Sequence, residues 1–255
     1  MIHPRKVRYG SLDSYVIDPA DEGSARAGSG RGLVVLCHGY GAPGTDMMGI
    51  VAEWVQLLGD AASRFRFVCP IAPHSLAELG MPDGRAWWPL NMARLMEAVQ
   101  ARRFDQLHQE TPPGIDQARE ALTELINAAL GEMSETSGGR EAKTPLAIGG
   151  FSQGAMLTMD TALRGEIPAP DYLMQFSGTV ICQAKWTAAL KRLEHTRVYQ
   201  SHGTIDPILP YSSAERLRDL LGAAGIDAEF HSFEGPHTID LDSIVATAQT
   251  LRSLA

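Results

Sequence analysis

The chain has 255 residues, of which 44% are hydrophobic and 20% charged, and this is enough for one α/β domain with a sizeable core. The formal net charge of -8 argues against nucleic acid as a partner, because phosphate binding needs a basic surface, and it gives no attraction to an anionic membrane. The sequence has no stretch of about 18 consecutive apolar residues, so integral membrane association is not expected.

The start of the chain and its cysteines indicate a reducing compartment. Residues 1–10 lack the apolar segment of a signal peptide. The cysteines are sparse and odd in number, which fits reduced thiols, so we expect a cytoplasmic protein. Cys37 and Cys69 end apolar runs and are interpreted as small core side chains rather than as metal ligands.

Short apolar runs alternate with longer helical patterns along the chain. An edge hairpin is expected first, at 7–17. Further strands are expected at 33–37, 65–71, 146–151, 172–176, 198–202 and, more weakly, 228–234. Helices are expected at about 46–58, 115–132, 153–163, 212–224 and 241–254. The alternation predicts a single α/β domain over 1–255, with a mostly parallel central sheet and helices on both faces.

Three stretches interrupt the alternation. Residues 18–32 and 131–145 are polar and glycine-rich, and we expect exposed loops there. Residues 72–114 are different, because they are rich in Trp, Met and Leu. Long excursions inside a compact domain are often functional, so 72–114 is a candidate lid or pocket wall.

A serine between two glycines follows the strand expected at 146–151. Residues 150–154 read Gly-Phe-Ser-Gln-Gly, and an apolar helical pattern follows. This order is typical of a nucleophile elbow, where the serine backbone is strained and side chains at the glycine positions would collide with the turn. The next helix would point its first N–H groups at developing negative charge. We therefore predict that Ser152 is a nucleophile rather than a helix cap.

A serine hydroxyl needs a base, and after an elbow of this kind an acid and then a histidine should follow in the chain. Asp206 comes directly after the strand expected at 198–202, and His237 lies in a loop between the last strand and the last helix. Such loops carry chemistry in α/β folds. The sequence therefore predicts a triad of Ser152, Asp206 and His237.

Three other histidines follow the serine and are interpreted as structural. His195 is expected to begin a strand and His231 to lie inside one. His202 ends a strand, and no well-placed acid precedes it.

The loop at 37–41, Cys-His-Gly-Tyr-Gly, follows the first buried strand and can supply an oxyanion hole. Its backbone N–H groups, together with the N–H of Gln153, can face a reacting carbonyl, and losing such a donor typically costs ~3 kcal/mol of transition-state stabilisation. We expect His38 to hold this loop in place rather than to act as a second base.

Two other functions fit some of the same residues. Residues 39–44 formally match the G-x-G-x-x-G pattern of dinucleotide-binding oxidoreductases. Against this, Pro43 lacks an N–H for phosphate, the strand at 65–71 does not end in an acid, and the motif follows an edge pair. The second alternative is a non-catalytic binding protein on the same scaffold, but every triad position holds a competent residue.

With these motifs in view, the chain resembles the phospholipase/carboxylesterase family of α/β-hydrolases, which includes acyl-protein thioesterases. The resemblance covers most of the chain. It rests on the following segments: Leu-Cys-His-Gly-Tyr-Gly at 36–41, Met-Pro-Asp-Gly-Arg-Ala-Trp-Trp at 81–88, Gly-Phe-Ser-Gln-Gly at 150–154, Ser-His-Gly-Thr-Ile-Asp-Pro at 201–207 and Gly-Pro-His at 235–237.

The resemblance implies a hydrolase that needs neither an organic cofactor nor a metal. It implies oxyanion donors at the N–H groups of Tyr40 and Gln153, and an acyl pocket beside Trp87 and Trp88. The sequence departs from the family at Pro89, where members often carry an acid, and by a longer stretch at 91–113.

Together these observations predict cleavage of carboxylic ester or thioester bonds. The expected substrates are small or lipid-like acyl esters with short-to-medium chains. An acyl-enzyme intermediate on Ser152 would be released by water.

Overall fold

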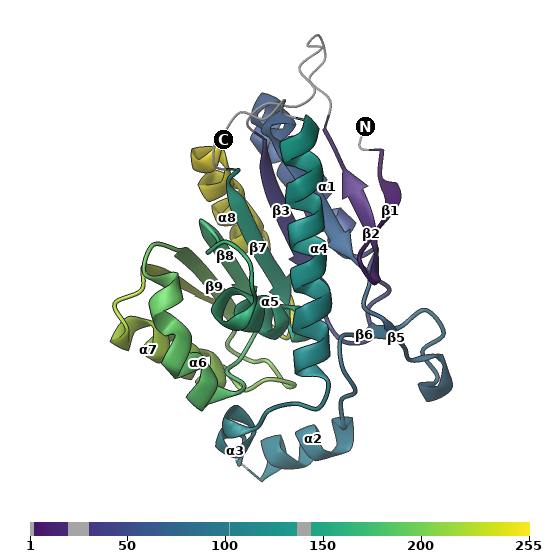
Figure 1. Ribbon diagram of the computed structural model, residues 1–255. Coiled ribbons are helices and arrows are strands. Elements are labelled where there is room, and N and C mark those ends of the chain that lie inside the picture. The colour runs from purple at the N-terminus through teal and green to yellow at the C-terminus, as the bar shows by residue number, and fades with distance from the viewer. Residues whose placement is uncertain (1–2, 20–30, 102, 137–143) are drawn as a thin grey trace.

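The computed structural model describes residues 3–19, 31–101, 103–136 and 144–255 (Figure 1). Among these residues, eight strands form one sheet in the order β1-β2-β4-β3-β7-β8-β9-β10. The strands are β1 Arg5–Tyr9, β2 Leu12–Ile17, β3 Gly32–Cys37, β4 Phe65–Pro70, β7 Leu146–Phe151, β8 Tyr172–Phe176, β9 Arg197–Gly203 and β10 Ala228–Phe233. The pairs β1–β2 and β2–β4 are antiparallel and the others parallel, which confirms the predicted fold class.

Helices cover both faces of the sheet. Those packed on it are α1 Met47–Leu58, α4 Ile115–Thr136, α5 Gln153–Arg164, α6 Gln183–Ala189, α7 Tyr211–Ala223 and α8 Leu241–Leu254, and the 3₁₀ turns η1 Gly59–Arg64 and η3 Leu190–Leu193 extend α1 and α6. An apolar cluster joins α1 and α8 to one face, and a second cluster joins α4, α5, α6 and α7 to the other (Figure 1). Strands β3 and β4 are buried along their whole length. The sequence of β3 is apolar throughout, as a strand covered on both faces requires, whereas β4 contains Arg66, which pairs with Asp18 at 2.9 Å.

The excursion at 72–114 has secondary structure of its own. A short antiparallel pair, β5 His74–Ser75 and β6 Arg85–Ala86, encloses the 3₁₀ turn η2 Ala77–Leu79, and α2 Met92–Gln100 and α3 Asp105–Gln109 follow. Figure 1 shows α2 and α3 below the ends of β7 and β9, at the edge of the sheet where parallel strands end. We call the segment with α2 and α3, residues 89–114, the cap.

Some sequence expectations were wrong in detail. Residues 131–136 continue α4 instead of forming a loop, since Met133 still packs into the core beside that helix. The remainder of that expected loop, 137–143, and residues 20–30 of the other lie outside the described residues. His195 does not begin a strand but sits in an exposed turn before β9.

In the described chain, no helix combines the length and apolar character that a membrane crossing requires.

Candidate active site

Ser152 occupies a strained turn between β7 and α5. Its backbone has φ 53° and ψ -116°, in a region that favours glycine. A Cβ on Gly154 would lie 2.3 Å from the Cys37 carbonyl oxygen, and one on Gly150 would lie 2.5 Å from the backbone of Gly154. The elbow therefore requires both glycines, as the sequence pattern predicted, and it lifts Ser152 to the N-terminus of α5.

Asp206 lies in the loop after β9 with its side chain buried. One carboxylate oxygen, Oδ1, accepts the N–H groups of Ile208 at 2.8 Å and Leu209 at 2.9 Å. The other oxygen, Oδ2, lies 2.6 Å from Nδ1 of His237. Burial by itself would raise the pKa of Asp206, but hydrogen bonds from His202 and His237 outweigh it and hold that pKa well below its usual range. Asp206 is therefore a permanent anion at neutral pH.

His237 lies in the loop between β10 and α8. Since a carboxylate only accepts hydrogen bonds, Nδ1 of His237 carries the proton in the contact with Asp206, and Nε2 has the lone pair of a general base. The ring packs against Phe151, the neighbour of the serine, with centroids 4.7 Å apart. A Cβ on Gly203 would meet the Gly235 carbonyl oxygen at 2.2 Å, so the loops that carry Asp206 and His237 touch.

Sequence reasoning missed the contact between His202 and Asp206. His202 is fully buried, and its Nε2 lies 3.2 Å from Oδ2 of Asp206 and 2.9 Å from the carbonyl oxygen of Leu209. The sequence offers no well-placed acid before His202, and the acid that it contacts follows it by four residues. The sequence Ser-His-Gly-Thr-Ile-Asp contains that spacing, but only the fold of the loop turns it into a contact.

The expected oxyanion donors lie beside the serine. Tyr40, in the loop after β3, and Gln153, the first residue of α5, both line the same cavity as Ser152. Among the described residues, neither backbone N–H donates a hydrogen bond within the protein, so both can point at a substrate oxygen. The first N–H groups of a helix have no partner inside it, which explains the free donor of Gln153.

His38 holds the loop at 37–41 in place, as expected. Its Nδ1 donates to the carbonyl oxygen of Gly39 at 2.8 Å, and its Nε2 accepts the N–H of Ala72 at 3.0 Å. Burial lowers the pKa of His38, which keeps the ring neutral. The indole N–H of Trp87 donates to the His38 carbonyl oxygen at 2.8 Å, so this loop is also fixed from the excursion.

An apolar cavity of about 560 Å³ opens at Ser152. The cap forms much of its wall, opposite α5 and the loops after β8 and β9. The residues that line the cavity include Trp88, Leu95, Phe104, Ser152, Ile208 and His237. Of the two tryptophans expected at a pocket, Trp88 lines the cavity, whereas Trp87 does not reach it and packs on the ring of His38 instead.

The glycine-rich loop at 39–44 has few donors left for a phosphate. The N–H of Gly41 donates to the Arg85 carbonyl oxygen at 2.8 Å, and that of Ala42 points back to Gly39 at 3.4 Å. Pro43 has no N–H. Residues 41–43 therefore offer no free N–H to a phosphate.

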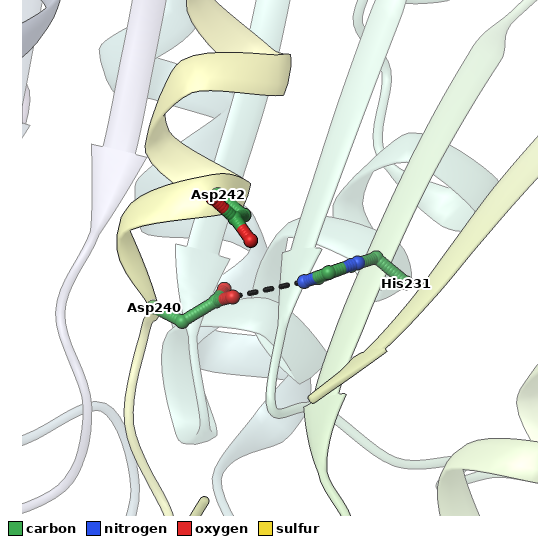
Figure 2. Close-up of side chains that lie close together, drawn as sticks. All are labelled: His231, Asp240 and Asp242. Carbon is green, nitrogen blue, oxygen red and sulfur yellow. Dashed lines mark hydrogen bonds and ion pairs between the residues drawn. The ribbon is translucent and has the colours of Figure 1, made fainter. Parts of the chain in front are cut away.

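One group in the described chain has the composition of a metal site, at His231, Asp240 and Asp242. Their ligand atoms lie within 4.8 Å of one another (Figure 2). The side chains are already engaged, because Nε2 of His231 bonds Oδ2 of Asp240 at 2.8 Å and Oδ1 of Asp240 caps α8 through Ser243. The group ties β10 to α8, on either side of the loop that carries His237.

Comparison with known proteins adds to this geometry. The sequence profile of the Phospholipase/Carboxylesterase family matches residues 24–254. The chain is 30% identical to acyl-protein thioesterase 1 of Eremothecium gossypii over 203 residues, which cover 76% of this chain and 74% of that protein. It is 25% identical to acyl-protein thioesterase 1 homolog 1 of Dictyostelium discoideum over 225 residues, 82% of this chain and 86% of that protein.

Solved structures show the same fold. The crystal structure of esterase PE8 superposes with a TM-score of 0.72 at 27% identity and covers 96% of this chain and 99% of its own. Acyl-protein thioesterase 2 of Zea mays superposes with a TM-score of 0.62 at 20% identity, covering 94% and 98% of the two chains.

Proposed function

Because the chain belongs to the phospholipase/carboxylesterase family, we propose that it is a serine hydrolase that cleaves carboxylic ester or thioester bonds through Ser152, Asp206 and His237. The observation that carries the proposal is the 2.6 Å contact between Asp206 and His237, beside a strained serine in one apolar cavity. A strained serine in a turn, taken alone, would have a structural explanation, and so would a histidine in a loop. The three together supply a nucleophile, a base and a group that orients the base.

In the first half of the reaction, Oγ of Ser152 attacks the acyl carbon while Nε2 of His237 takes the hydroxyl proton. The negative charge that develops on the substrate oxygen accepts hydrogen bonds from the N–H groups of Tyr40 and Gln153. Asp206 stabilises the imidazolium and keeps the proton of Nδ1 in place. The imidazolium then protonates the leaving alcohol or thiol, and the acyl group stays on Ser152.

In the second half, water takes the place of the leaving group. His237 removes a proton from the water, and the resulting hydroxide attacks the acyl carbon of the ester on Ser152. Collapse of the second tetrahedral intermediate returns the proton from Nε2 to Oγ and releases the carboxylic acid. Each step uses protein groups and water.

The cavity supports an acyl chain as the part of the substrate that is bound. Its lining is mostly apolar, and a chain placed there would bury its methylenes at about 0.8 kcal/mol each. Since the cap supplies Leu95 and Phe104 to the wall, it acts as a cover that excludes water from the reacting centre. This role fits a single domain in which 72–114 serves the site.

Covalent labelling tests the proposal. A fluorophosphonate probe should react with Ser152, since it needs an activated serine, and Ser152→Ala should lower kcat by roughly 10⁶-fold. Ser14→Ala is a matched control, because Ser14 is a buried serine of β2 whose hydroxyl has no hydrogen-bond partner in the described chain. It should keep both labelling and hydrolysis of p-nitrophenyl acyl esters. An active Ser152→Ala variant, or a loss of activity with EDTA, would contradict the mechanism.

A further inference from the structure

The carboxylate of Asp206 is shared between two imidazoles. Its Oδ2 faces Nδ1 of His237 at 2.6 Å and Nε2 of His202 at 3.2 Å, while Oδ1 holds the backbone of the next turn. The histidine–carboxylate pair of the proposed function needs only the first of these contacts. The second histidine therefore has no role in that mechanism as it stands.

Hydrogen-bond roles place the proton of His202 on Nε2. The two groups near that atom, Oδ2 of Asp206 and the carbonyl oxygen of Leu209 at 2.9 Å, can only accept. One N–H thus faces two acceptors: it is hydrogen-bonded to the Leu209 carbonyl oxygen and makes the longer contact with Oδ2 of Asp206. The other ring nitrogen, Nδ1, is buried without a partner in the described chain, which is less costly for a lone pair than for an N–H.

These contacts close a ring of three residues. The Nε2–H of His202 donates to the carbonyl oxygen of Leu209 and lies against Oδ2 of Asp206 at 3.2 Å, and the N–H of Leu209 donates back to Oδ1 of Asp206 at 2.9 Å. Leu209 also lines the cavity and packs with Leu95 and Phe104 of the cap. This closed set of contacts among His202, Asp206 and Leu209 therefore fixes both the Asp206 carboxylate and one wall of the cavity.

We propose that His202 is a positioning residue: through its Nε2–H it holds the Asp206 carboxylate in the orientation that His237 needs. The inference rests on the proposed function. His202 does not line the cavity and is fully buried, so it acts through Asp206 and not on the substrate. Among the described residues, the ionisable groups that make a polar or ring contact with the His202 imidazole are Asp206 and, from α7, Tyr211, whose ring centroid lies 6.3 Å from that of His202.

Loss of the Nε2–H donor of His202 should shift the pH dependence of kcat/KM in a predictable direction. An oxygen with two donors is a weaker acceptor for each of them than an oxygen with one. Without His202, Oδ2 would interact more strongly with His237 and favour its protonated form, which is inactive as a base. The acid limb of kcat/KM should then move to higher pH. In addition, kcat should fall, because a carboxylate that His202 no longer fixes in one orientation aligns the imidazole less well.

The test compares His202→Gln with His202→Met. The two side chains have similar length, but only glutamine places an N–H near the position of Nε2. We expect the methionine variant to lose about 10- to 100-fold in kcat, with KM little changed and the acid limb raised by about 0.5–1 pH unit. The glutamine variant should recover most of kcat and the pH profile of the unsubstituted protein. Equal losses in both variants, or an unchanged profile in the methionine variant, would overturn the inference.

A measurement on the unsubstituted protein covers the case in which the variants fail to fold. Nuclear magnetic resonance of protein with ¹⁵N-labelled histidine reports which ring nitrogen carries the proton, and the His202 signal should show Nε2–H near neutral pH. A proton on Nδ1 instead would overturn the proposal. Neither result depends on whether Ser152 reacts with fluorophosphonate, so failure of the proposed function would be seen separately.

Discussion

Gln153 Oε1 accepts the backbone N–H of Trp87 at 2.8 Å, and its Nε2 donates to the carbonyl oxygen of Trp88 at 3.0 Å. One side chain at the start of α5 thus holds two residues of the excursion. Because the N–H of Gln153 itself is a proposed oxyanion donor, the same residue joins the reacting centre to the cavity wall.

Gln153→Met should separate these contacts from the backbone donor. Two buried backbone groups would lose their partners, at about 1–3 kcal/mol each in the free energy of unfolding, and kcat/KM should fall as the Trp88 wall loosens. Gln175→Met is the control, since Gln175 is another buried amide with hydrogen bonds of its own, to Thr158 and Met174, and does not line the cavity. Urea unfolding should show both variants less stable. Equal losses of kcat/KM in both variants would argue against a link between the Gln153 side chain and the cavity wall at Trp88.

Gly154→Ala should disrupt the elbow. Its Cβ would lie 2.3 Å from the Cys37 carbonyl oxygen and 2.5 Å from that of His38, and backbone atoms cannot move aside as side-chain ends do. We expect a loss of about 1–3 kcal/mol or more in stability, with loss of esterase activity. Gly222→Ala is the matched change in α7, where the new Cβ meets nothing within 4 Å, and it should stabilise by about 0.5–1 kcal/mol. Thermal melts would show the opposite signs, and a stable, active Gly154→Ala would contradict the account.

Trp88→Ala should change acyl-chain selectivity. Trp88 lines the cavity, so its loss removes a contact surface for the chain and should flatten the rise in kcat/KM, which for an intact wall is about fourfold per methylene. Trp87→Phe is the comparison, because Trp87 contacts the His38 loop and not the cavity. It should scale kcat/KM by one common factor over a series of p-nitrophenyl esters. If Trp88→Ala gave that pattern instead, Trp88 would have no part in chain binding.

His108 should make stability depend on pH. It lies in α3, buried against Thr179 of the cavity wall, and burial, helped by the charge of Arg216, lowers its pKa from 6.5 to about 4. Between these values the unfolded chain binds a proton that the folded chain does not. Stability should therefore fall as pH drops through 6.5 towards 4, by about 2–3 kcal/mol from this residue.

The variant His108→Gln tests that sign, because glutamine keeps a polar contact with Thr179 but does not titrate. Urea unfolding at pH 7 and pH 5 should show a smaller loss of stability in the variant than in the unsubstituted protein. His195→Gln is the control, since 91% of the His195 side chain is exposed, and it should change nothing. An identical pH dependence in His108→Gln would contradict the prediction.

Local patterns in the sequence were sufficient for the sheet and for the elbow. Apolar runs such as 33–37 and 146–151 become buried strands because a parallel strand covered on both faces needs apolar side chains throughout. The two glycines around Ser152 are required by contacts within one turn and its neighbouring strand, so the motif carried that information by itself. The catalytic roles of Ser152, Asp206 and His237 stay predictions until the labelling and kinetics are done.

Tertiary structure decided what depends on contacts between distant segments. The helices of the cap and α6 are five to nine residues long, too short for a clear helical period, and they form because they pack on the site and the core. Adjacent tryptophans in the chain went to different places, Trp88 to the cavity and Trp87 to the His38 loop. His202 meets Asp206 only because the loop after β9 turns back on itself, and no periodicity in the sequence describes such a turn.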